Sequence, residues 1–301
     1  MTQPVVLVLR ALGLGDLLTG VPAVRAVRRA FPGHALVLAT PPALAPLVSA
    51  IGGVDRHLPT AAYVREPPST VDWDGPVDVA VNLHGRGPQS HDVLRALRPG
   101  RLLGFDLKGP QWTDGGPTEH EVPRWCRMLR AYGIPADPAD LDLGTSAGEH
   151  VVVHPGASST DRCWPVERFA AVARALSDDG HRVLLTGGPD ERERAFAVAL
   201  GAGLPPDAVL AGRTDVGQLA ALVRRAALVV CGDTGVAHLA TAYRAPSVVL
   251  FGPMDPARWG PPPERPWHRT LWHGPGGLDT ITVDEVLDAA REAVGHAAAA
   301  G

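Results

Sequence analysis

Residues 227–240, ALVVCGDTGVAHLA, constrain the fold of this chain more than any other stretch of the sequence. They begin with a short apolar run at 228–230, which is typical of a strand buried in a parallel sheet. The run stops at the glycine-flanked turn 232–235, and a helical segment follows, for which Asp233 or Thr234 is a suitable N-cap. A strand, turn and helix in this order place unpaired N–H groups at the edge of a sheet, where an anion can bind. An ordinary strand-to-helix turn without a ligand has the same pattern.

Strand and helix patterns alternate along the chain in two series, which predicts an α/β fold with parallel strands and right-handed crossovers. The first series has strands at 5–9, 35–39, near Arg56, 77–83 and 101–105, and helices at 17–31, 41–50, 91–97 and 119–132. The second series has strands at 151–153, 182–186, 208–210, 228–231 and 247–251, and helices at 165–177, 191–200, 216–225, 236–243 and 283–299.

Residues 134–148 separate the two series. They contain prolines and aspartates without periodicity, and we interpret them as a linker. A chain of 301 residues is long enough for two domains of about 150 residues each, so we expect one at 1–148 and another at 149–301. Two such domains facing each other would form a cleft, which is a favoured ligand site. Three further segments are predicted to be irregular, at 63–76, 108–117 and 253–266.

Composition excludes several classes of protein. The sequence is 45% hydrophobic but has no apolar run long enough to span a membrane, and its first residues lack the features of a signal peptide. We therefore expect a cytoplasmic protein. The net charge of −4 argues against a dedicated nucleic-acid binder. The three cysteines share no metal-ligand spacing, and we interpret them as free thiols.

Polar residues follow three neighbouring strands of the second series. Because the carboxyl ends of parallel strands lie at one edge of a sheet, these side chains should converge. Arg162 suits phosphate oxygens, which a guanidinium binds in bidentate fashion, and a helix N-terminus adds backbone amides. Asp190 or Glu191 is suited to a pair of ribose hydroxyls. The sequence thus predicts a nucleotide-diphosphate site formed by Ser158, Ser159, Thr160, Arg162, Asp190, Glu191, Asp233, Thr234, Gly235 and His238. For His238, a phosphate contact and a role in capping and packing the helix both remain open.

In the first series, Asp16 lies in the first strand-to-helix turn, where the helix dipole favours a carboxylate. It could serve as a general base that deprotonates an acceptor hydroxyl, or as an N-cap. Arg10 could steer an anionic acceptor, or could be a solvated arginine at the end of a strand. Together with Gly15, Asn82 and His84, Arg10 forms the predicted acceptor-binding set.

Other known site patterns are absent or weak. Asp-x-Asp occurs at 72–74 and at 140–142, but both lie in segments predicted to be irregular, so we interpret them as solvated turn and linker carboxylates. The 12 histidines form no metal-ligand cluster, and we predict no metal site. A Walker A sequence and a Gly-x-Ser-x-Gly nucleophile elbow are both missing.

Three motifs in order resemble glycosyltransferase family 9, the bacterial heptosyltransferases that use ADP-heptose. They are Leu14-Gly15-Asp16-Leu17-Leu18 with Val21-Pro22-Ala23; His154-Pro155-Gly156-Ala157 with Trp164-Pro165 and Phe169; and Gly232-Asp233-Thr234-Gly235 with His238 and Phe251-Gly252-Pro253-Met254-Asp255-Pro256. The resemblance covers most of the chain. It implies a GT-B fold of two Rossmann-like domains, the first for the acceptor and the second for the nucleotide-sugar. It also implies that the closing helix often packs back on the first domain.

The resemblance further implies an inverting, metal-independent transfer without a cofactor, from a nucleotide-diphospho-sugar to a hydroxyl of a glycan or natural product. Asp16 falls at the base, and the 233–235 turn falls at the diphosphate. Two positions depart from the pattern: Arg162 stands where members often carry lysine, and Thr19 where lipopolysaccharide enzymes often carry histidine. We expect a monomer, which a lipid-linked acceptor would bring close to a membrane. The alternatives are a nucleotide-sugar isomerase or epimerase, and a non-catalytic nucleotide-sugar-binding protein.

Overall fold

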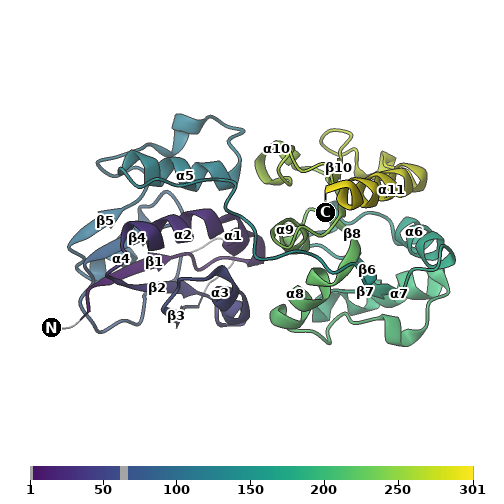
Figure 1. Ribbon diagram of the computed structural model, residues 1–301, viewed down its shortest axis with the longest axis horizontal. Coiled ribbons are helices and arrows are strands. Elements are labelled where there is room, and N and C mark those ends of the chain that lie inside the picture. The colour runs from purple at the N-terminus through teal and green to yellow at the C-terminus, as the bar shows by residue number, and fades with distance from the viewer. Residues whose placement is uncertain (1–2, 62–66, 301) are drawn as a thin grey trace. The chain divides into compact units, whose positions relative to one another are not determined.

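The computed structural model describes residues 3–61 and 67–300 of the chain (Figure 1). Parts of two sequence predictions lie outside these residues, namely the first two residues of the N-terminal segment and positions 63–66 of the predicted irregular segment. The chain divides into two compact units, Met1–Leu141 and Asp142–Gly301. The boundary between them falls inside 134–148, the stretch interpreted above as a linker.

The N-terminal unit is built on a parallel sheet of five strands in the order β3-β2-β1-β4-β5. Its central strand β1 is buried along its whole length, which explains its uninterrupted run of valine and leucine. The strands are β1 (Val5–Leu9), β2 (Ala35–Thr40), β3 (Arg56–Pro59), β4 (Val79–Asn82) and β5 (Arg101–Leu103). All five coincide with predicted strands.

The helices of this unit match the prediction with one correction. The single helix predicted at 17–31 is two helices, α1 (Leu14–Thr19) and α2 (Val21–Ala30), which meet at Gly20. Pro22 explains the break, because proline lacks the N–H that an uninterrupted helix would need there and is accepted in a first turn. The remaining helices are α3 (Ala45–Ile51), α4 (Gln89–Ala96) and α5 (Glu121–Ala131), with short 3-10 turns at Pro42–Leu44 and Trp112–Gly115.

The C-terminal unit has a second parallel sheet, in the order β10-β9-β8-β6-β7. Its strands are β6 (His150–His154), β7 (Val183–Leu185), β8 (Ala226–Gly232), β9 (Ser247–Leu250) and β10 (His268–Leu271). The prediction differs from the structure at two places. No strand was predicted after 247–251, but β10 follows it. The strand predicted at 208–210 is reduced to one parallel bridge between Val209 and Leu185, because the preceding residues form the 3-10 turn Pro206–Ala208.

The bridge at Val209 shows that the two sheets share the same strand topology. If it is counted as a vestigial third strand, the C-terminal sheet has the order 3-2-1-4-5-6 of dinucleotide-binding folds, and the N-terminal sheet has 3-2-1-4-5. In each sheet, strand order reverses beside the first strand. These switch points lie between β1 and β4 and between β6 and β8. Both units are therefore Rossmann-like, as the sequence predicted.

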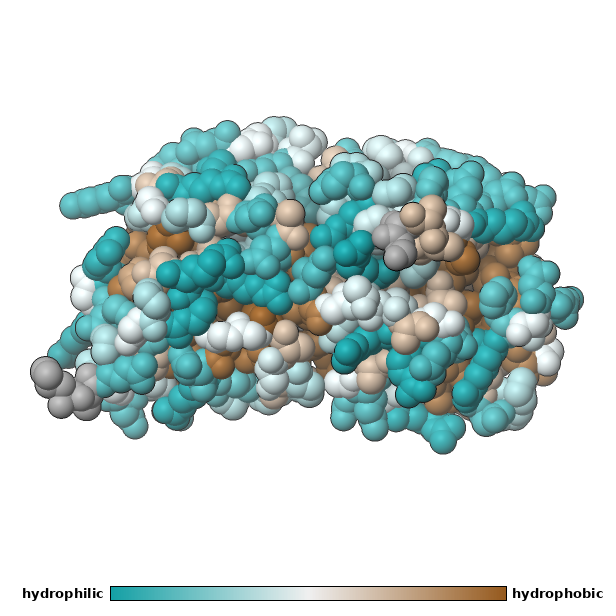
Figure 2. Space-filling model, in the orientation of Figure 1, coloured by the Kyte–Doolittle hydropathy of each residue, from teal (hydrophilic) through white to brown (hydrophobic). Residues whose placement is uncertain are grey.

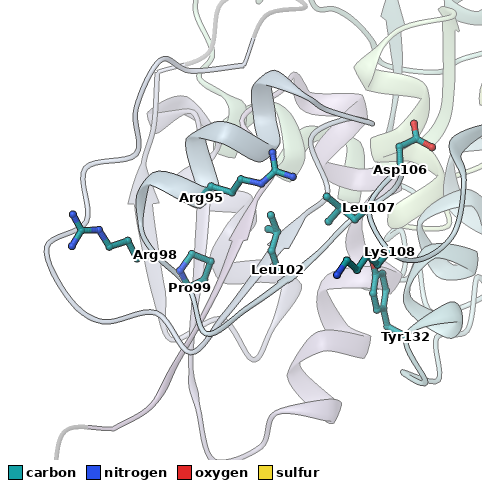
Figure 3. A pocket seen from close by; sticks show the side chains of 8 residues that line it. All are labelled: Arg95, Arg98, Pro99, Leu102, Asp106, Leu107, Lys108 and Tyr132. Carbon is teal, nitrogen blue, oxygen red and sulfur yellow. The ribbon is translucent and has the colours of Figure 1, made fainter.

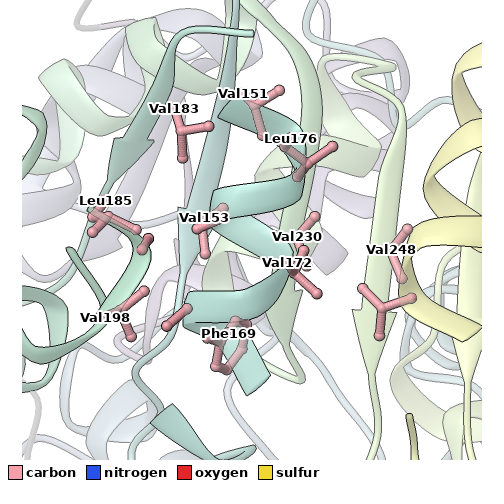
Figure 4. Packing of buried hydrophobic residues seen from close by; sticks show 14 of the residues in the cluster. Val151, Val153, Phe169, Val172, Leu176, Val183, Leu185, Val198, Val230 and Val248 are labelled. Carbon is pink, nitrogen blue, oxygen red and sulfur yellow. The ribbon is translucent and has the colours of Figure 1, made fainter. Parts of the chain in front are cut away.

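Helices α6 (Val166–Asp178), α7 (Arg192–Ala202) and α11 (Val283–Ala300) of the C-terminal unit pack with the sheet in one apolar cluster. Figure 4 shows Phe169, Val172 and Leu176 of α6 facing valines of the sheet. Fully burying a side chain of this size contributes roughly 1.5–3 kcal/mol. The closing helix α11 contributes Val286 and Ala290 to the same cluster, so its buried face belongs to the C-terminal core. The helices are α6 (Val166–Asp178), α7 (Arg192–Ala202), α8 (Val216–Arg224), α9 (Gly235–Ala242), α10 (Pro256–Trp259) and α11 (Val283–Ala300).

The surface carries few large apolar side chains. Hydrophilic residues cover most of the face seen in Figure 2, and Phe196, Leu200 and Val294 are the large apolar residues recorded as exposed within the described chain. In the same part of the chain, no helix combines the length and the apolarity needed to cross a membrane. Cys126, Cys163 and Cys231 are free thiols, as predicted.

Candidate functional site

The switch point of the C-terminal sheet brings the ends of β6 and β8 together. His154, the last residue of β6, pairs with Cys231 of β8, so the segments that follow both strands leave the sheet side by side. Ligands of open α/β sheets bind in the crevice outside such strand ends. The residues predicted to hold a diphosphate follow these strands and β7.

The turn after β8 caps helix α9 through Thr234, whose hydroxyl accepts a hydrogen bond from the Val236 amide at 3.3 Å. Of the two N-caps proposed from sequence, Thr234 is therefore the one used. Asp233 instead faces Arg162, with 3.5 Å between Oδ2 and Nη1. Burial raises the pKa of the Asp233 carboxyl above its ordinary value, and the charge of Arg162 opposes this shift. A partly exposed arginine is thus held beside the N-terminus of α9.

Two glycines let the loop after β6 approach the sheet. A Cβ on Gly232 would lie 3.2 Å from the carbonyl oxygen of Arg162, and one on Gly252 would lie 3.1 Å from that of Asp161. Both neighbours are backbone atoms of the 3-10 turn Thr160–Arg162. The two glycine motifs therefore seat this turn between the ends of β8 and β9. The hydroxyl-bearing residues at its start, Ser158, Ser159 and Thr160, are exposed.

The end of β6 carries a polar cluster of His154, Thr186 and Glu191, of which the sequence assigned only Glu191 to the site. His154 Nδ1 lies 3.0 Å from Thr186 Oγ1, and its Nε2 lies 3.7 Å from Glu191 Oε2. Burial lowers the pKa of His154 below its ordinary value, and the charge of Glu191 opposes this. The His-Pro-Gly motif was the one sequence signal for this cluster, since a histidine at the end of a buried strand needs a polar partner.

Glu191 rather than Asp190 reaches the end of β6. One carboxylate oxygen of Glu191 accepts a hydrogen bond from the Gly188 amide at 2.6 Å, and a Cβ at Gly156 would collide with the same side chain. Asp190 is exposed. His238 lies on α9, and its ring packs edge-on against Trp259 of α10 at 5.9 Å between centroids.

The switch point of the N-terminal sheet places Asp16 and His84 after neighbouring strands, since Leu9 of β1 pairs with Asn82 of β4. Asp16 lies half-buried in the first turn of α1, with Gly15 beside it. The alternative that Asp16 is an N-cap was wrong, because Gly13 occupies the N-cap position and no side chain caps this helix.

Arg10 is fully buried, so the alternative of a solvated arginine was also wrong. Its guanidinium donates to the carbonyl oxygens of Asp16 and Leu83 and to Thr19 Oγ1. The Arg10 side chain is long enough to reach water, but its N–H groups donate hydrogen bonds inside the unit instead. This leaves no exposed guanidinium atom for an acceptor.

Asn82 and His84 differ in what they offer a ligand. Asn82 is completely buried, and it bonds Gly85 O, Ser90 Oγ and the His84 amide. These bonds shape the loop after β4. His84 keeps a buried Nδ1 without a hydrogen-bond partner among the described residues. Burial, followed by the charge of Arg10, lowers the pKa of His84 to about 4, so its imidazole is neutral at physiological pH.

The Asp-x-Asp pairs have different surroundings. Asp72 and Asp74 are exposed, as expected of turn carboxylates. The carboxylates of the second pair are partly exposed, at 26% for Asp140 and 39% for Asp142, but both are ion-paired. Asp140 bonds Arg25 and Arg29 at 2.7 Å each, and Asp142 bonds Arg265 at 2.7 Å. Ion pairing with arginines from other elements gives these linker residues a structural role.

A separate cavity of about 490 Å³ lies along the edge strand β5 (Figure 3). Arg95 and Arg98 line it from α4 and the turn after it, and Lys108 and Tyr132 line its other side. None of its lining residues belongs to the predicted sites.

Two Rossmann-like units with polar switch points define the chain as a two-domain α/β protein of the GT-B class. Solved structures of this class agree over nearly the whole chain. A family 9 glycosyl transferase from Veillonella parvula superimposes with a TM-score of 0.80 at 18% identity and 97% coverage of both chains. ADP-heptose lps heptosyltransferase II from E. coli gives a TM-score of 0.79 at 20% identity, with coverage of 98% and 99%.

Sequence comparisons point to the same class of protein. Residues 134–271 match the model of glycosyltransferase family 9 (heptosyltransferase). Lipopolysaccharide heptosyltransferase 3 of Escherichia coli is 34% identical over 186 residues, which cover 60% of this chain and 48% of that protein. Lipopolysaccharide heptosyltransferase 1 of strain K12 is 25% identical over 290 residues, covering 85% and 90%. The chain spans about half the length of the first curated relatives it matches.

Proposed function

We propose that this protein is an inverting, metal-independent glycosyltransferase that moves heptose from ADP-heptose to a hydroxyl of a lipopolysaccharide acceptor. The observation that carries the proposal is the arrangement at the β6–β8 switch point. There, Arg162 and the capped N-terminus of α9 lie together, inside the stretch 134–271 that matches glycosyltransferase family 9. The relatives named above are lipopolysaccharide heptosyltransferases, which favours transfer over the isomerase and the non-catalytic alternatives.

The donor is assigned to the C-terminal unit. The diphosphate lies at the N-terminus of α9, where the amides of the 233–235 turn and the guanidinium of Arg162 meet its negative charge. Its charge competes with Asp233 for Arg162, so binding transfers the arginine from the carboxylate to the phosphate. The exposed hydroxyls of Ser158, Ser159 and Thr160 supply further hydrogen bonds. Glu191 takes the ribose, and His238 flanks the phosphate from α9.

The acceptor is assigned to the N-terminal unit, where Asp16 is the general base. The acceptor oxygen forms a bond to the anomeric carbon while the bond from that carbon to the diphosphate breaks. ADP leaves with the electron pair of the broken bond, and the acceptor proton passes to Asp16. Attack from the face opposite the leaving group inverts the anomeric centre. The amides of α9 and Arg162 stabilise the charge that grows on ADP.

His84 completes the acceptor side. Its imidazole is neutral at physiological pH, so His84 can contact the acceptor without adding charge beside Asp16. Gly15 precedes Asp16 in the first turn of α1, and we assign it to the acceptor side with Asp16. We further propose that the enzyme acts as a monomer and meets a lipid-linked acceptor at a membrane surface.

A thermal-shift comparison of nucleotide-sugars tests the donor assignment. A ligand that binds only the folded state stabilises it by about 2.7 kcal/mol at a hundredfold excess over its dissociation constant. We expect ADP-heptose and ADP to raise the melting temperature, and UDP-, GDP- and TDP-sugars to leave it unchanged at the same concentration. A shift with UDP- or TDP-sugars but none with ADP compounds would reject ADP-heptose as the donor.

A further inference from the structure

Arg10 is a charged side chain with no exposed surface, in a position where an apolar residue would be cheaper to bury. It directly follows β1, and its Cζ lies 4.9 Å from the ring centroid of Trp125. A leucine or methionine would fill the same space against this ring without removing a charge from water. The presence of an arginine therefore calls for a role that its hydrogen bonds perform.

The donors of Arg10 join two segments that lie far apart in sequence. Nε donates to the carbonyl oxygen of Asp16, and Nη1 donates to that of Leu83, 73 residues away from Arg10. Nη2 donates to Thr19 Oγ1 at 3.0 Å, and the Thr19 hydroxyl donates in turn to the Asp16 carbonyl at 3.0 Å. The planar guanidinium thus fixes the turn that carries Asp16 relative to the loop that carries His84.

The local sequence leaves room for this side chain. A Cβ on Gly20 would lie 2.5 Å from Arg10 Nε and 2.7 Å from its Cδ. The break between α1 and α2 therefore falls at a residue whose missing side chain is replaced by Arg10. Burial lowers the pKa of Arg10 below its ordinary value, and the charges of Asp16 and Glu121 partly offset this by favouring the charged guanidinium. Glu121 is anchored by Trp125, whose Nε1 donates to it at 2.9 Å.

We propose that Arg10 is a positioning residue that holds the Asp16 turn and the Leu83–His84 segment in the geometry required for deprotonating the acceptor. This inference rests on the function proposed above. It assigns Arg10 a positioning role in place of the acceptor-binding role that the sequence predicted. Arg10 touches neither substrate. It acts through the backbone carbonyls of Asp16 and Leu83, with Thr19 as a bridge.

Substitution of Arg10 tests the proposal on the full-length protein. We expect Arg10→Met to lower kcat for heptose transfer from ADP-heptose to heptose-deficient lipopolysaccharide by at least a hundredfold, at a temperature where the variant is fully folded. The dissociation constant for ADP, measured calorimetrically, should change less than twofold. Arg10→Lys, which keeps the charge and up to three donors, should regain at least tenfold of the lost kcat. A merely structural role would not separate kcat from ADP binding in this way. A kcat for Arg10→Met within threefold of the parent overturns the proposal.

Hydrogen exchange gives a readout that does not depend on transfer activity. In Arg10→Met, peptides spanning 13–20 and 83–87 should exchange at least tenfold faster, while the α9 peptide stays unchanged. Gly20→Ala, which displaces the guanidinium, should reproduce the effect, and Gly33→Ala, whose Cβ meets nothing within 4 Å, should not. Unchanged exchange at both segments overturns the proposal. Absence of transfer in the parent protein, with the expected exchange pattern, rejects the proposed function but retains the positioning by Arg10.

Discussion

At the scale of single residues, the account depends on Arg162 and on the carboxylate that it faces. Asp233 is buried and lies 3.5 Å from Arg162, which is long for an ion pair and leaves part of the guanidinium exposed. A diphosphate offers more charge and better hydrogen-bond geometry than this carboxylate. The pair is therefore suited to exchange a protein partner for a ligand.

Replacing Arg162 tests this exchange. Arg162→Met should weaken ADP binding about ten- to a hundredfold, because a hydrogen bond to a charged group contributes about 1.5–3 kcal/mol. Arg162→Lys should fall between this variant and the parent. Isothermal titration with ADP measures the effect, and Arg291→Met on the exposed face of α11 is the matched control. If Arg162→Met binds ADP as tightly as the control does, Arg162 does not contact the diphosphate.

Several residue roles could not be predicted from sequence. Arg10 follows a strand, where a long charged side chain usually reaches solvent, and its burial depends on a carbonyl 73 residues away. Asp140 and Asp142 resembled solvated linker residues because their arginine partners lie on other elements. Tertiary contacts of this kind leave no local signal. Thr234, by contrast, could be named as one of two candidate N-caps, because capping is decided within one turn.

At the scale of elements, the account depends most on helix α9 and the turn that precedes it. An apolar run, glycines and a capping threonine predicted a strand, a turn and a helix at the positions where β8 and α9 occur. The element predictions failed where the local pattern is weak. The strand β10 has the sequence HRTL and lies at the sheet edge, where most of its residues are half-buried. Because these residues are mostly polar, the strand lacks the apolar pattern from which the other strands were predicted. The predicted strand at 208–210 was lost to a 3-10 turn that begins at Pro206, and prolines favour such turns.

The cap of α9 should matter for both stability and binding. Thr234→Ala should reduce the free energy of unfolding by about 1 kcal/mol through the lost cap, and it should also weaken ADP binding. Asp215→Ala removes a comparable cap from α8, where Asp215 accepts from the Gln218 amide at 2.7 Å. This control should lose similar stability but keep its ADP affinity. Equal ADP affinities for the two variants would mean that the N-terminus of α9 is not the anion site.

At the scale of the whole molecule, both units follow one plan, a doubly wound parallel sheet with polar residues at its switch point. This plan was predictable because it depends on a repeated strand-and-helix rhythm, which survives local errors. Buried neutral histidines are a second property of the chain as a whole. Besides His84 and His154, burial and two nearby arginines lower the pKa of His268 to about 3.

These histidines predict loss of stability in acid. Because the folded-state pKa of His268 lies below its unfolded value of 6.5, the unfolded chain binds the proton first as pH falls. The contribution of neutral His268 to the free energy of unfolding is therefore fully present well above pH 6.5. It decreases at lower pH, by an amount on the order of 2 kcal/mol at pH 5. His268→Asn retains a polar partner for Ser247 and does not titrate. Its melting temperature should fall less than that of the parent between pH 7.5 and pH 5, and an equal fall would exclude His268 as a source of acid sensitivity.

The central claim is that this chain transfers a sugar, with Asp16 of the N-terminal unit as the base and with the nucleotide bound by the C-terminal unit. The most direct test is to measure heptose transfer from ADP-heptose to heptose-deficient lipopolysaccharide by the parent protein and by Asp16→Asn, together with ADP binding by both. The account predicts transfer by the parent, a loss of at least a hundredfold in kcat for Asp16→Asn, and equal ADP affinities, since general-base catalysis contributes about 10²–10⁴-fold. Full transfer activity in Asp16→Asn would contradict it.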